Sequence, residues 1–248
     1  MSAIYIMWLR QLKRHFRSKA RLIGSLGQPL LFLLGFGFGF GSIYQRAGGG
    51  SYIQFLAPGI IAMSVLFTAI FSGIEVIWDR QFGFLKETLV VPVSRLQIML
   101  GKTLGGATVA TIQGLFVFFI SLLVGFRPTN LSLLPLAFLF MFLIALVFTA
   151  VGTAIASTLT DMHAFQLIMN FLVMPLFFLS GALFPLEGLP KVMSLIVSLN
   201  PLSYGVDGIR GALIGIFNFG VMFDFMALLG SSIIFLFLGS FLFGRIEA

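Results

Sequence analysis

Long uncharged stretches, separated by short charged ones, dominate this chain. Six runs of 20 or more residues contain no Asp, Glu, Lys or Arg: 22–45, 47–74, 103–126, 128–160, 162–186 and 225–244. A helix that crosses a bilayer needs about 20 apolar residues, so each run is long enough for one crossing. The pattern predicts an all-α membrane protein with six transmembrane helices, at about 22–43, 55–78, 104–126, 132–158, 164–185 and 224–244.

Two shorter uncharged runs, 192–206 and 211–223, lie between the fifth and the sixth predicted span. They are too short for a crossing, and they contain the helix-interrupting residues Asn200, Pro201 and Gly211. We therefore expect the region 186–223 to form a re-entrant or interfacial hairpin before the last span, on the outer side of the membrane.

The N-terminal segment, residues 1–21, has an amphipathic pattern. With 100° per residue, one face of a helix over 3–18 carries Ile4, Tyr5, Trp8, Leu9, Leu12 and Phe16, and the opposite face carries Arg10, Lys13, Arg14 and Arg17. Ile6 and Met7 do not fit this division. The pattern is typical of a helix that lies on an anionic membrane surface. The alternative is a basic orientation signal with no further role.

The stretch RQFGFLKETLVVPVSRLQIMLGK, residues 80–102, is charged and longer than a loop between two spans requires. Helical spacing over 80–90 places Phe82, Leu85 and Leu89 on one face and points Phe84, Lys86 and Glu87 elsewhere, and Pro92 ends the helix. We predict a short amphipathic helix whose first face packs on the membrane domain. Its other face is either solvated by lipid headgroups or docked on a cytoplasmic partner.

Composition and charge support a membrane location. The chain is 59% hydrophobic and 9% charged, whereas globular domains carry about 25% charged residues. The net charge of +7 raises the question of nucleic-acid binding, but the positions of the charges indicate a membrane surface instead. Eleven Lys and Arg residues fall on the side of the two termini and four on the other side. The positive-inside rule then places both termini and the loop 79–103 in the cytoplasm.

Residues with catalytic or metal-binding chemistry are scarce. The sequence has no Cys and two His, His15 and His163, so no metal site is expected. The triplet GKT at 101–103 resembles the end of a phosphate-binding loop, but Leu96 stands where that motif requires Gly. We expect neither a nucleotide site nor enzymatic activity in this chain. The glycine pairs 35/39 and 37/41 in the first span predict close helix packing.

Glu75 is the acid expected to lie within the membrane, since the acids at 79, 87, 161, 187, 207, 224 and 247 fall in predicted loops or near span ends. An intramembrane acid is a candidate for function in a stand-alone secondary transporter or channel. Glu75 lies about 6 Å from the interface, however, which favours either snorkelling to the interface or pairing with a basic residue of the N-terminal helix. Four spans contain neither charge nor His, so the energy for transport is expected to enter from elsewhere unless the protein is passive.

Three segments together resemble one transporter family. They are Arg80…Gly83-Phe84-Leu85-Lys86-Glu87-Thr88-Leu89…Pro92-Val93-Ser94-Arg95…Leu100-Gly101-Lys102, Ser180-Gly181 with Phe184-Pro185 and Leu189-Pro190, and Asn200-Pro201-Leu202-Ser203-Tyr204-Gly205-Val206-Asp207-Gly208-Ile209-Arg210-Gly211. In this order and spacing they are similar to ABC-2 type permeases, the membrane subunits of bacterial ABC exporters such as the daunorubicin-resistance and nodulation-factor permeases. The resemblance covers essentially the whole chain and implies one transmembrane domain, 1–248.

The resemblance also implies roles for particular residues. The loop 79–103 would carry the coupling helix, with Gly83, Phe84, Lys86, Glu87, Leu89 and Pro92 at the contact with a separate ATPase subunit. Asn200, Pro201 and Tyr204 would order an outer gate, although Asn200 fits a plain helix cap equally well. The link around Thr160, Asp161 and His163 would be a second, minor contact.

The implied assembly is a homo- or heterodimer of permeases with two ATPase copies, in the inner membrane of a bacterium or archaeon. No cofactor is expected in this chain, because ATP and magnesium would bind to the partner subunit. The implied function is export of an amphipathic drug, lipid or glycolipid by alternating access. Membrane lipid is an expected partner and nucleic acid is not.

Overall fold

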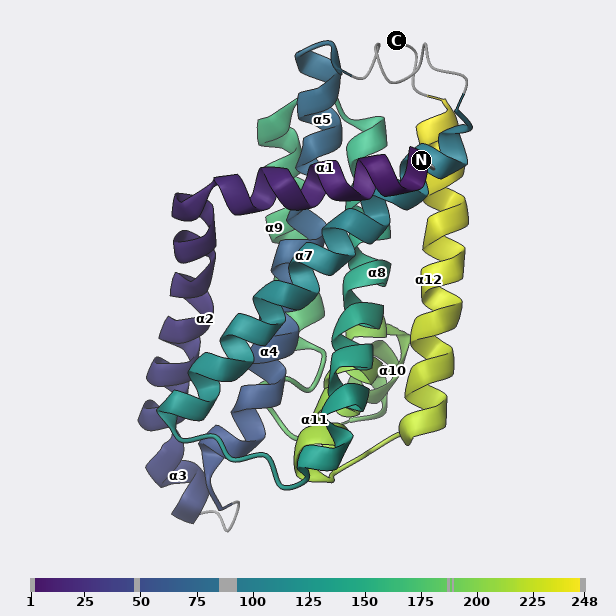
Figure 1. Ribbon diagram of the computed structural model, residues 1–248. Coiled ribbons are helices and arrows are strands. Elements are labelled where there is room, and N and C mark those ends of the chain that lie inside the picture. The colour runs from purple at the N-terminus through teal and green to yellow at the C-terminus, as the bar shows by residue number, and fades with distance from the viewer. Residues whose placement is uncertain (1–2, 47–49, 85–92, 187, 189, 246–248) are drawn as a thin grey trace.

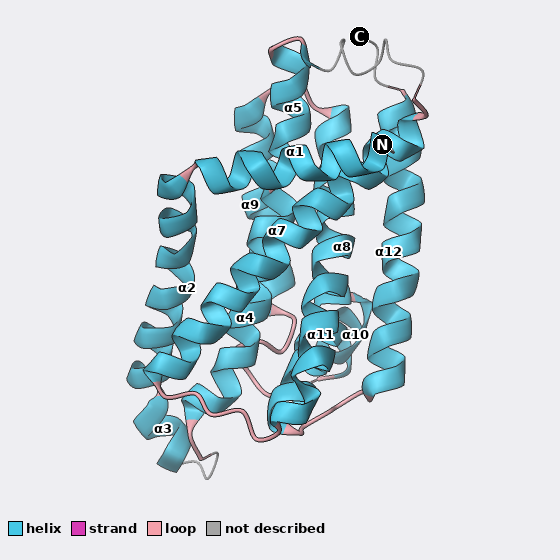
Figure 2. Cartoon of the chain, viewed as in Figure 1, coloured by secondary structure: helices cyan, strands magenta, loops and turns pink. Residues whose placement is uncertain are grey.

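The computed structural model describes residues 3–46, 50–84, 93–186, 188 and 190–245, and this part of the chain is helical with no strand (Figures 1 and 2). The helices are α1 (Ala3–Arg17), α2 (Lys19–Gly39), α3 (Gly41–Arg46), α4 (Tyr52–Phe71), α5 (Ile74–Gln81), α7 (Arg95–Val124), α8 (Leu134–Thr158), α9 (Met162–Phe178), α10 (Lys191–Leu199), α11 (Pro201–Ile214) and α12 (Val221–Gly244). A 3₁₀ turn, η1 (Leu131–Leu133), precedes α8. The all-α fold class expected from the sequence is confirmed.

Five apolar segments are long enough to cross a bilayer: Leu22–Gly39, Tyr52–Gln81, Arg95–Val124, Leu131–Thr158 and Val221–Gly244. Helices α10 and α11 form the bent pair expected before the last span, with an angle of 85° between them. The described ends of the chain, near Ala3 and Arg245, lie at the same end of the bundle (Figure 1). This arrangement is that of a multi-pass membrane protein.

The fifth predicted span differs in length from the helix observed. Helix α9 has 17 residues and ends at Phe178, whereas the uncharged run predicts a crossing from 164 to 185. Ser180 and Gly181, which has a φ of +74°, turn the chain after the helix. Hydropathy did not mark this end, because the residues that follow remain buried and apolar, including Ala182 and Leu183.

Local sequence explains where several helices begin and end. The side chains of Ser94, Asp161 and Asn200 accept hydrogen bonds from the first backbone amides of α7, α9 and α11, which are the groups that a helix start leaves unpaired. Gly125 and Gly215 end α7 and α11 in the left-handed conformation, with φ values of +113° and +79°.

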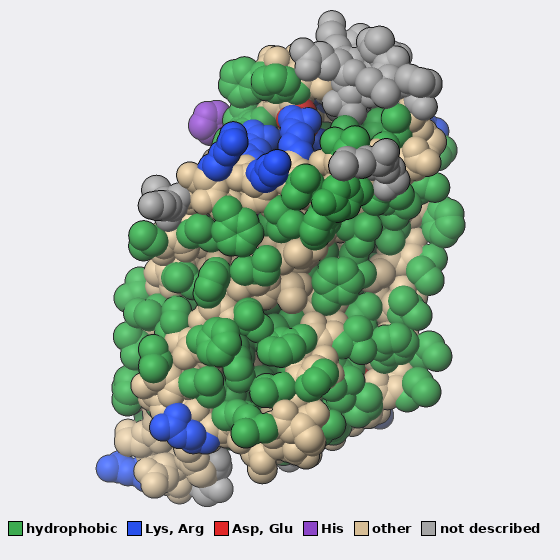
Figure 3. All heavy atoms as spheres, in the orientation of Figure 1, with side chains coloured by type: hydrophobic (Ala, Val, Ile, Leu, Met, Phe, Trp, Pro, Cys, Tyr) green, Lys and Arg blue, Asp and Glu red, His purple; other side chains and the backbone are tan. Residues whose placement is uncertain are grey.

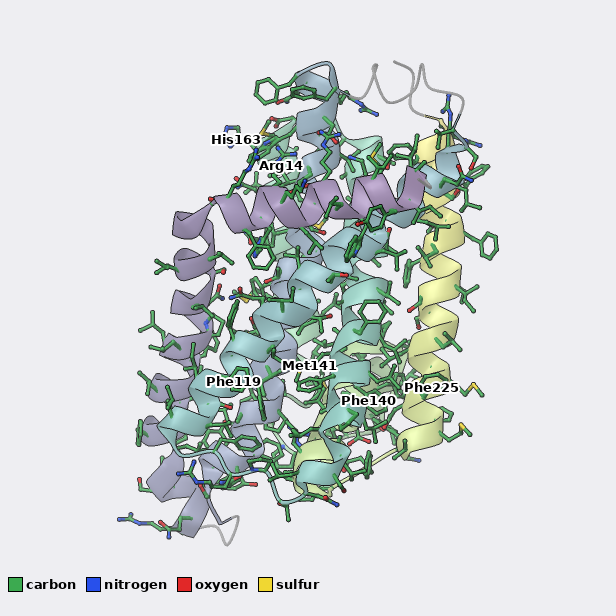
Figure 4. The ribbon with its side chains drawn as sticks, viewed as in Figure 1. Arg14, Phe119, Phe140, Met141, His163 and Phe225 are labelled. Atoms are coloured by element: carbon green, nitrogen blue, oxygen red, sulfur yellow. The ribbon has the colours of Figure 1, made fainter. Side chains whose placement is uncertain are left out.

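The core lies where α4, α7, α8 and α11 pack together. Phe140 and Met141 on α8 are fully buried and point into this interior (Figure 4). Two backbones approach closely at Gly73 and Gly152: a Cβ atom at Gly73 would lie 2.4 Å from the Gly152 carbonyl carbon. This contact holds the short break between α4 and α5 directly against α8.

Helix α1 lies across one end of the bundle, nearly perpendicular to the long helices (Figure 1). On the face shown in Figure 3, hydrophobic side chains cover the middle, and Lys and Arg side chains gather over α1, with fewer at the opposite end. The helix expected near 3–18 is therefore present, and its basic face is turned away from the apolar band.

The glycines of the first span make little contact within the described chain. A Cβ atom at Gly35, Gly39 or Gly41 would meet nothing within 4 Å, and one at Gly37 would lie 3.1 Å from the Ile53 side chain. The close helix packing predicted there is not made by the described residues of this chain, because α2 packs mainly on α4 and leaves most of its surface outward.

Candidate functional site

The structure describes two of the six predicted coupling residues, Gly83 and Phe84. Gly83 has a φ of +79°, a conformation that glycine adopts without strain, and Phe84 beside it is half exposed. The guanidinium carbon of Arg10 lies 5.8 Å from the centre of the Phe84 ring. Lys86, Glu87, Leu89 and Pro92 lie outside the described residues.

The start of this segment differs from the prediction. Residues 80 and 81 belong to the last turn of α5, and the helix ends at Gln81, so no helix begins at residue 80. Phe82 was expected to pack on the membrane domain, but 69% of its surface is exposed. Helical spacing does not apply to Phe82, because it follows the end of α5 and precedes Gly83, whose positive φ is not helical.

Asp79 is the centre of an ion network just before this segment, and sequence reasoning missed it. Its carboxylate accepts from Arg10 Nη2 at 2.7 Å and from Lys102 Nζ, and Arg14 Nη1 lies 3.6 Å away. Asp79 is 4% exposed, although the sequence placed it in a loop. One acid thus joins α1, α5 and α7. A signal was present, because Asp79 follows Glu75 by four residues and therefore shares its helix face.

Glu75 pairs with the N-terminal helix, one of the two arrangements that the sequence favoured. Its carboxylate lies 3.8 Å from Arg14 Nη1, and the side chain is buried. The Arg14 guanidinium also stacks over Trp78, with 5.0 Å between its central carbon and the ring centre. Arg14 is labelled in Figure 4 at the same end of the bundle as His163. The N-terminal helix therefore supplies the counter-charge for both acids of α5.

Direct backbone packing fixes α1 on α7. A Cβ atom at Gly101 would lie 2.6 Å from Met7 Cβ and 3.0 Å from the Ile4 carbonyl oxygen, and one at Gly105 would lie 2.6 Å from Gln11 Cβ. The spacing of four residues is the small-xxx-small pattern of closely packed helices. Trp8 Nε1 also donates to Thr108 Oγ1 at 3.0 Å. The glycine of the GKT triplet is thus a packing residue.

The end of α5 is also tied to the link between α8 and α9. Arg80 donates to the carbonyl oxygens of Leu159 and Ser157, both at 3.1 Å, and Gln81 donates to that of Thr160 at 2.9 Å. These contacts hold the end of α5, just before Gly83 and Phe84, against the link that contains the second predicted contact, at 160–163. Backbone amides of Ala164 and His163 donate to Asp161, which lowers its pKa.

At the opposite end, the predicted gate residues hold the hairpin together. Asn200 Oδ1 accepts from the Leu202 amide at 3.0 Å, while its Nδ2 donates to the Leu176 carbonyl oxygen at 2.7 Å. Tyr204 donates its hydroxyl proton to the Ser198 carbonyl oxygen. Pro201 occupies the first turn of α11. Asn200 is therefore both a helix cap and a link to α9.

Three charged residues near this hairpin are buried: Asp207, Arg210 and Asp224. Asp207 lies within α11 and not in a loop, whereas Asp224 lies in the first turn of α12, near a span end as predicted. Arg210 is 2% exposed, donates to the Gly181 carbonyl oxygen at 2.9 Å and stacks on Phe55 at 4.0 Å. Asp207 accepts from the amides of Asn218 and Phe219, both at 2.8 Å.

Glycines 205, 208 and 211 hold this part of α11 close to Ile144, Phe140 and Phe217. The spacing of three residues between these glycines is the sequence feature that indicates close packing of this segment.

A helical bundle with several apolar spans, a lateral amphipathic helix and a bent hairpin before the last span defines a multi-pass membrane transport protein. The family profile of the ABC-2 type transporter matches residues 2–214. The chain belongs to the ABC-2 type transporter family and is a membrane subunit of an ABC transporter.

Similar proteins agree with this assignment. The chain is 36% identical over 201 residues to the transport permease ycf38 of Pyropia yezoensis. The aligned region covers 79% of this chain and 68% of that protein. It is 32% identical over 213 residues to nodulation protein J of Rhizobium leguminosarum bv. trifolii, which covers 85% of this chain and 78% of the relative. Membership of the family implies partnership with an ABC ATPase subunit.

Proposed function

We propose that the chain is the permease of an ATP-driven exporter and moves an amphipathic substrate, such as a drug, lipid or glycolipid, out of the cytoplasm. Two permease copies and two ATPase subunits form the transporter in the inner membrane of a bacterium or archaeon. ATP and magnesium bind in the ATPase subunits. Both termini and the segment around Phe84 face the cytoplasm, in agreement with the gathering of Lys and Arg over α1 (Figure 3).

The ion network at Asp79 is the observation that carries this proposal. It lies four residues before Gly83 and joins three helices through one buried carboxylate. A buried ion network at the end of a span connects the point where an ATPase applies force to the helices that move. In this proposal the ATPase binds at Gly83, Phe84, Lys86, Glu87, Leu89 and Pro92, and the network passes its movement to α1 and α7.

The break between α4 and α5 suits this transmission. Helix α4 ends at Phe71 and α5 begins at Ile74, so the last eight residues of the second span form a separate lever. Gly73 contacts the backbone of α8 at the break, and Arg80 and Gln81 hold the far end of the lever to the α8–α9 link. A push on Phe84 therefore turns α5 about Gly73 and moves α1, α7 and α8 together.

The outer end supplies the second gate of alternating access. The carbonyl groups at the end of α9 are bonded by Asn200 from the hairpin. Opening outward requires these hydrogen bonds to break or to move as one body. In this proposal Asn200, Pro201 and Tyr204 keep the hairpin closed until the ATPase subunits close at the other end.

Co-purification tests the proposal. The tagged chain is solubilised from its host, and the expected result is capture of an ATPase subunit. Phe84→Ala and Glu87→Ala are expected to reduce capture at least tenfold, while Phe237→Ala, an exposed residue on the lipid-facing surface of α12, leaves it unchanged. Transport by the purified chain in vesicles without any ATPase would contradict the proposal.

The alternative is a stand-alone secondary transporter or channel that uses Glu75, and the position of Glu75 in the lining of an internal cavity favours it. Under the exporter proposal Glu75→Gln weakens the contact with Arg14 and lowers expression or assembly, with little change in the pH dependence of transport. A shift of the pH optimum with normal expression would support the alternative instead.

A further inference from the structure

A cavity of about 500 Å³ lies beneath the bend between α1 and α2, and α4, α5, α7 and α9 complete its walls. Its volume falls in the range of roughly 300–1,000 Å³ that is typical of small-molecule sites. None of the residues assigned to coupling or to the outer gate lines it. The cavity therefore needs an explanation of its own.

Of the three carboxamides that line the cavity, Gln11 belongs to α1, while Gln28 on α2 and Asn170 on α9 lie well inside the membrane. Each of the latter two lies eight or nine residues from the start of its helix, which corresponds to a depth of about 12–14 Å. Among the described residues neither carboxamide makes a hydrogen bond, and both side chains are exposed at the edge of the cavity. An amide in contact with hydrocarbon and without a hydrogen-bond partner is unfavourable.

The inner wall carries further neutral polar groups. Ser64 on α4 is 3% exposed, and within the described part of the chain its hydroxyl has no hydrogen-bond partner. Thr68 lies one turn further along the same helix and also lines the cavity. Hydroxyls and carboxamides each donate and accept. They match a ligand group that does both, such as a hydroxyl or an amide.

Full charges contribute little to this lining. The carboxylate in the wall is Glu75, and Arg14 lies 3.8 Å from it. No Lys or Arg is among the described lining residues. The other titratable group in the wall is the His15 imidazole, so an anionic head group would meet no permanent cation among the described lining residues. A cationic head group would have to compete with Arg14. Phe67, Phe71 and Met63 provide an apolar wall beside the polar groups.

We infer that this cavity binds the uncharged, hydroxyl- or amide-bearing head group of an amphiphile, with Gln28, Asn170 and Ser64 as hydrogen-bonding residues. The apolar part of the ligand lies along Phe67 and Phe71. This inference rests on the proposed export function and narrows its substrate class to neutral polar heads. The ligand enters between α2 and α9, where the two carboxamides stand at the edge.

Photolabelling of the purified chain in phosphatidylcholine nanodiscs tests the inference. The probe is an alkyl glucoside with a diazirine in its chain, and the competitors are octyl glucoside, octyl phosphate and octyltrimethylammonium. We expect labelled peptides from α4 and α9, and competition by the glucoside at least tenfold more effective than by either charged amphiphile.

Gln28→Leu and Asn170→Leu are each expected to weaken probe binding about tenfold. The matched control is Gln166→Leu, which removes an exposed carboxamide one turn earlier on α9 that does not line the cavity. Binding unchanged by Gln28→Leu and Asn170→Leu, or equal competition by all three head groups, would overturn the inference. So would a loss of dimers in these variants without loss of probe binding, because the carboxamides would then join two copies of the chain.

The experiment contains no ATPase, so its result is independent of co-purification. If the ATPase is captured but the cavity takes no probe, the inference fails and the exporter proposal stands. If the probe binds as expected and no ATPase is captured, the exporter proposal fails instead.

Discussion

Substitution of Asp79 tests the ion network most directly. The side chain of Lys102 is 5% exposed, and Asp79 is its counter-ion among the described residues. Asp79→Asn leaves that ammonium buried without a counter-charge, and loss of one partner from a buried pair destabilises by about 3–5 kcal/mol. Arg10, at 38% exposure, adds about 0.5 kcal/mol because water screens its pair. We expect a total near 3 kcal/mol, since asparagine keeps some hydrogen bonds.

The reverse substitution should be milder. Lys102→Met leaves Asp79 with Arg10 at 2.7 Å and Arg14 at 3.6 Å, so we expect a loss of about 1 kcal/mol. The double variant Asp79→Leu with Lys102→Met removes both buried charges and should lie within about 2 kcal/mol of the wild type. The order of stability is then wild type, Lys102→Met, the double variant and Asp79→Asn.

Thermal unfolding in detergent measures this order. A loss of 3 kcal/mol corresponds to a fall in apparent Tm of roughly 6–12 °C for a chain of this size. Lys13→Met is the control, because Lys13 on α1 is an exposed lysine at the same end of the bundle. If Lys102→Met destabilises as much as Asp79→Asn, or if the double variant does not recover stability, the reasoning about the unpaired ammonium is wrong.

Three further outcomes follow from contacts described above. Gly101→Ala should detach α1 and speed its proteolysis several-fold, because a Cβ atom there would lie 2.6 Å from Met7; Gly35→Ala, with nothing within 4 Å, should not. Arg210→Gln should lower stability by about 2 kcal/mol in thermal unfolding, through loss of charged hydrogen bonds to buried carbonyls. Asp161→Asn should make little difference to the free energy of unfolding at acidic pH. Because the pKa of Asp161 is lowered in the folded chain, its extra stabilisation over asparagine is present at neutral pH and disappears as the pH falls through that pKa; a difference that persists in acid would contradict this.

The sequence supported the spans and the N-terminal helix because both depend on local pattern: charge-free length and a repeating apolar face. Depth alone favoured either snorkelling or pairing for Glu75, and the structure has it beside Arg14. Burial of Asp79, Asp207 and Arg210 did not follow, because their partners are side chains of distant segments, backbone amides of the turn after α11, or backbone carbonyls. Such contacts exist only in the folded bundle.

The glycines show the same limit. The glycine pairs in the first span have the same spacing as Gly101 and Gly105. Helix α1 packs directly on Gly101 and Gly105, whereas most glycines of the first span contact no other helix among the described residues. The fifth span was predicted too long because Ala182 and Leu183, which follow Phe178, are buried against α4 rather than by lipid. Composition does not distinguish these two apolar surroundings. The roles of the coupling and gate residues stay predictions.

The network at Asp79 also bears on how the chain is made. During synthesis α1 leaves the ribosome first, but its counter-charges at Glu75 and Asp79 follow some 60 residues later, and Gly101 and Gly105, on which it packs, come later still. The first helix therefore cannot reach its final position until the third long helix has been inserted. A chain stalled before Lys102 therefore exposes an undocked basic helix. This exposed helix distinguishes an unfinished permease from a finished one for quality-control proteases.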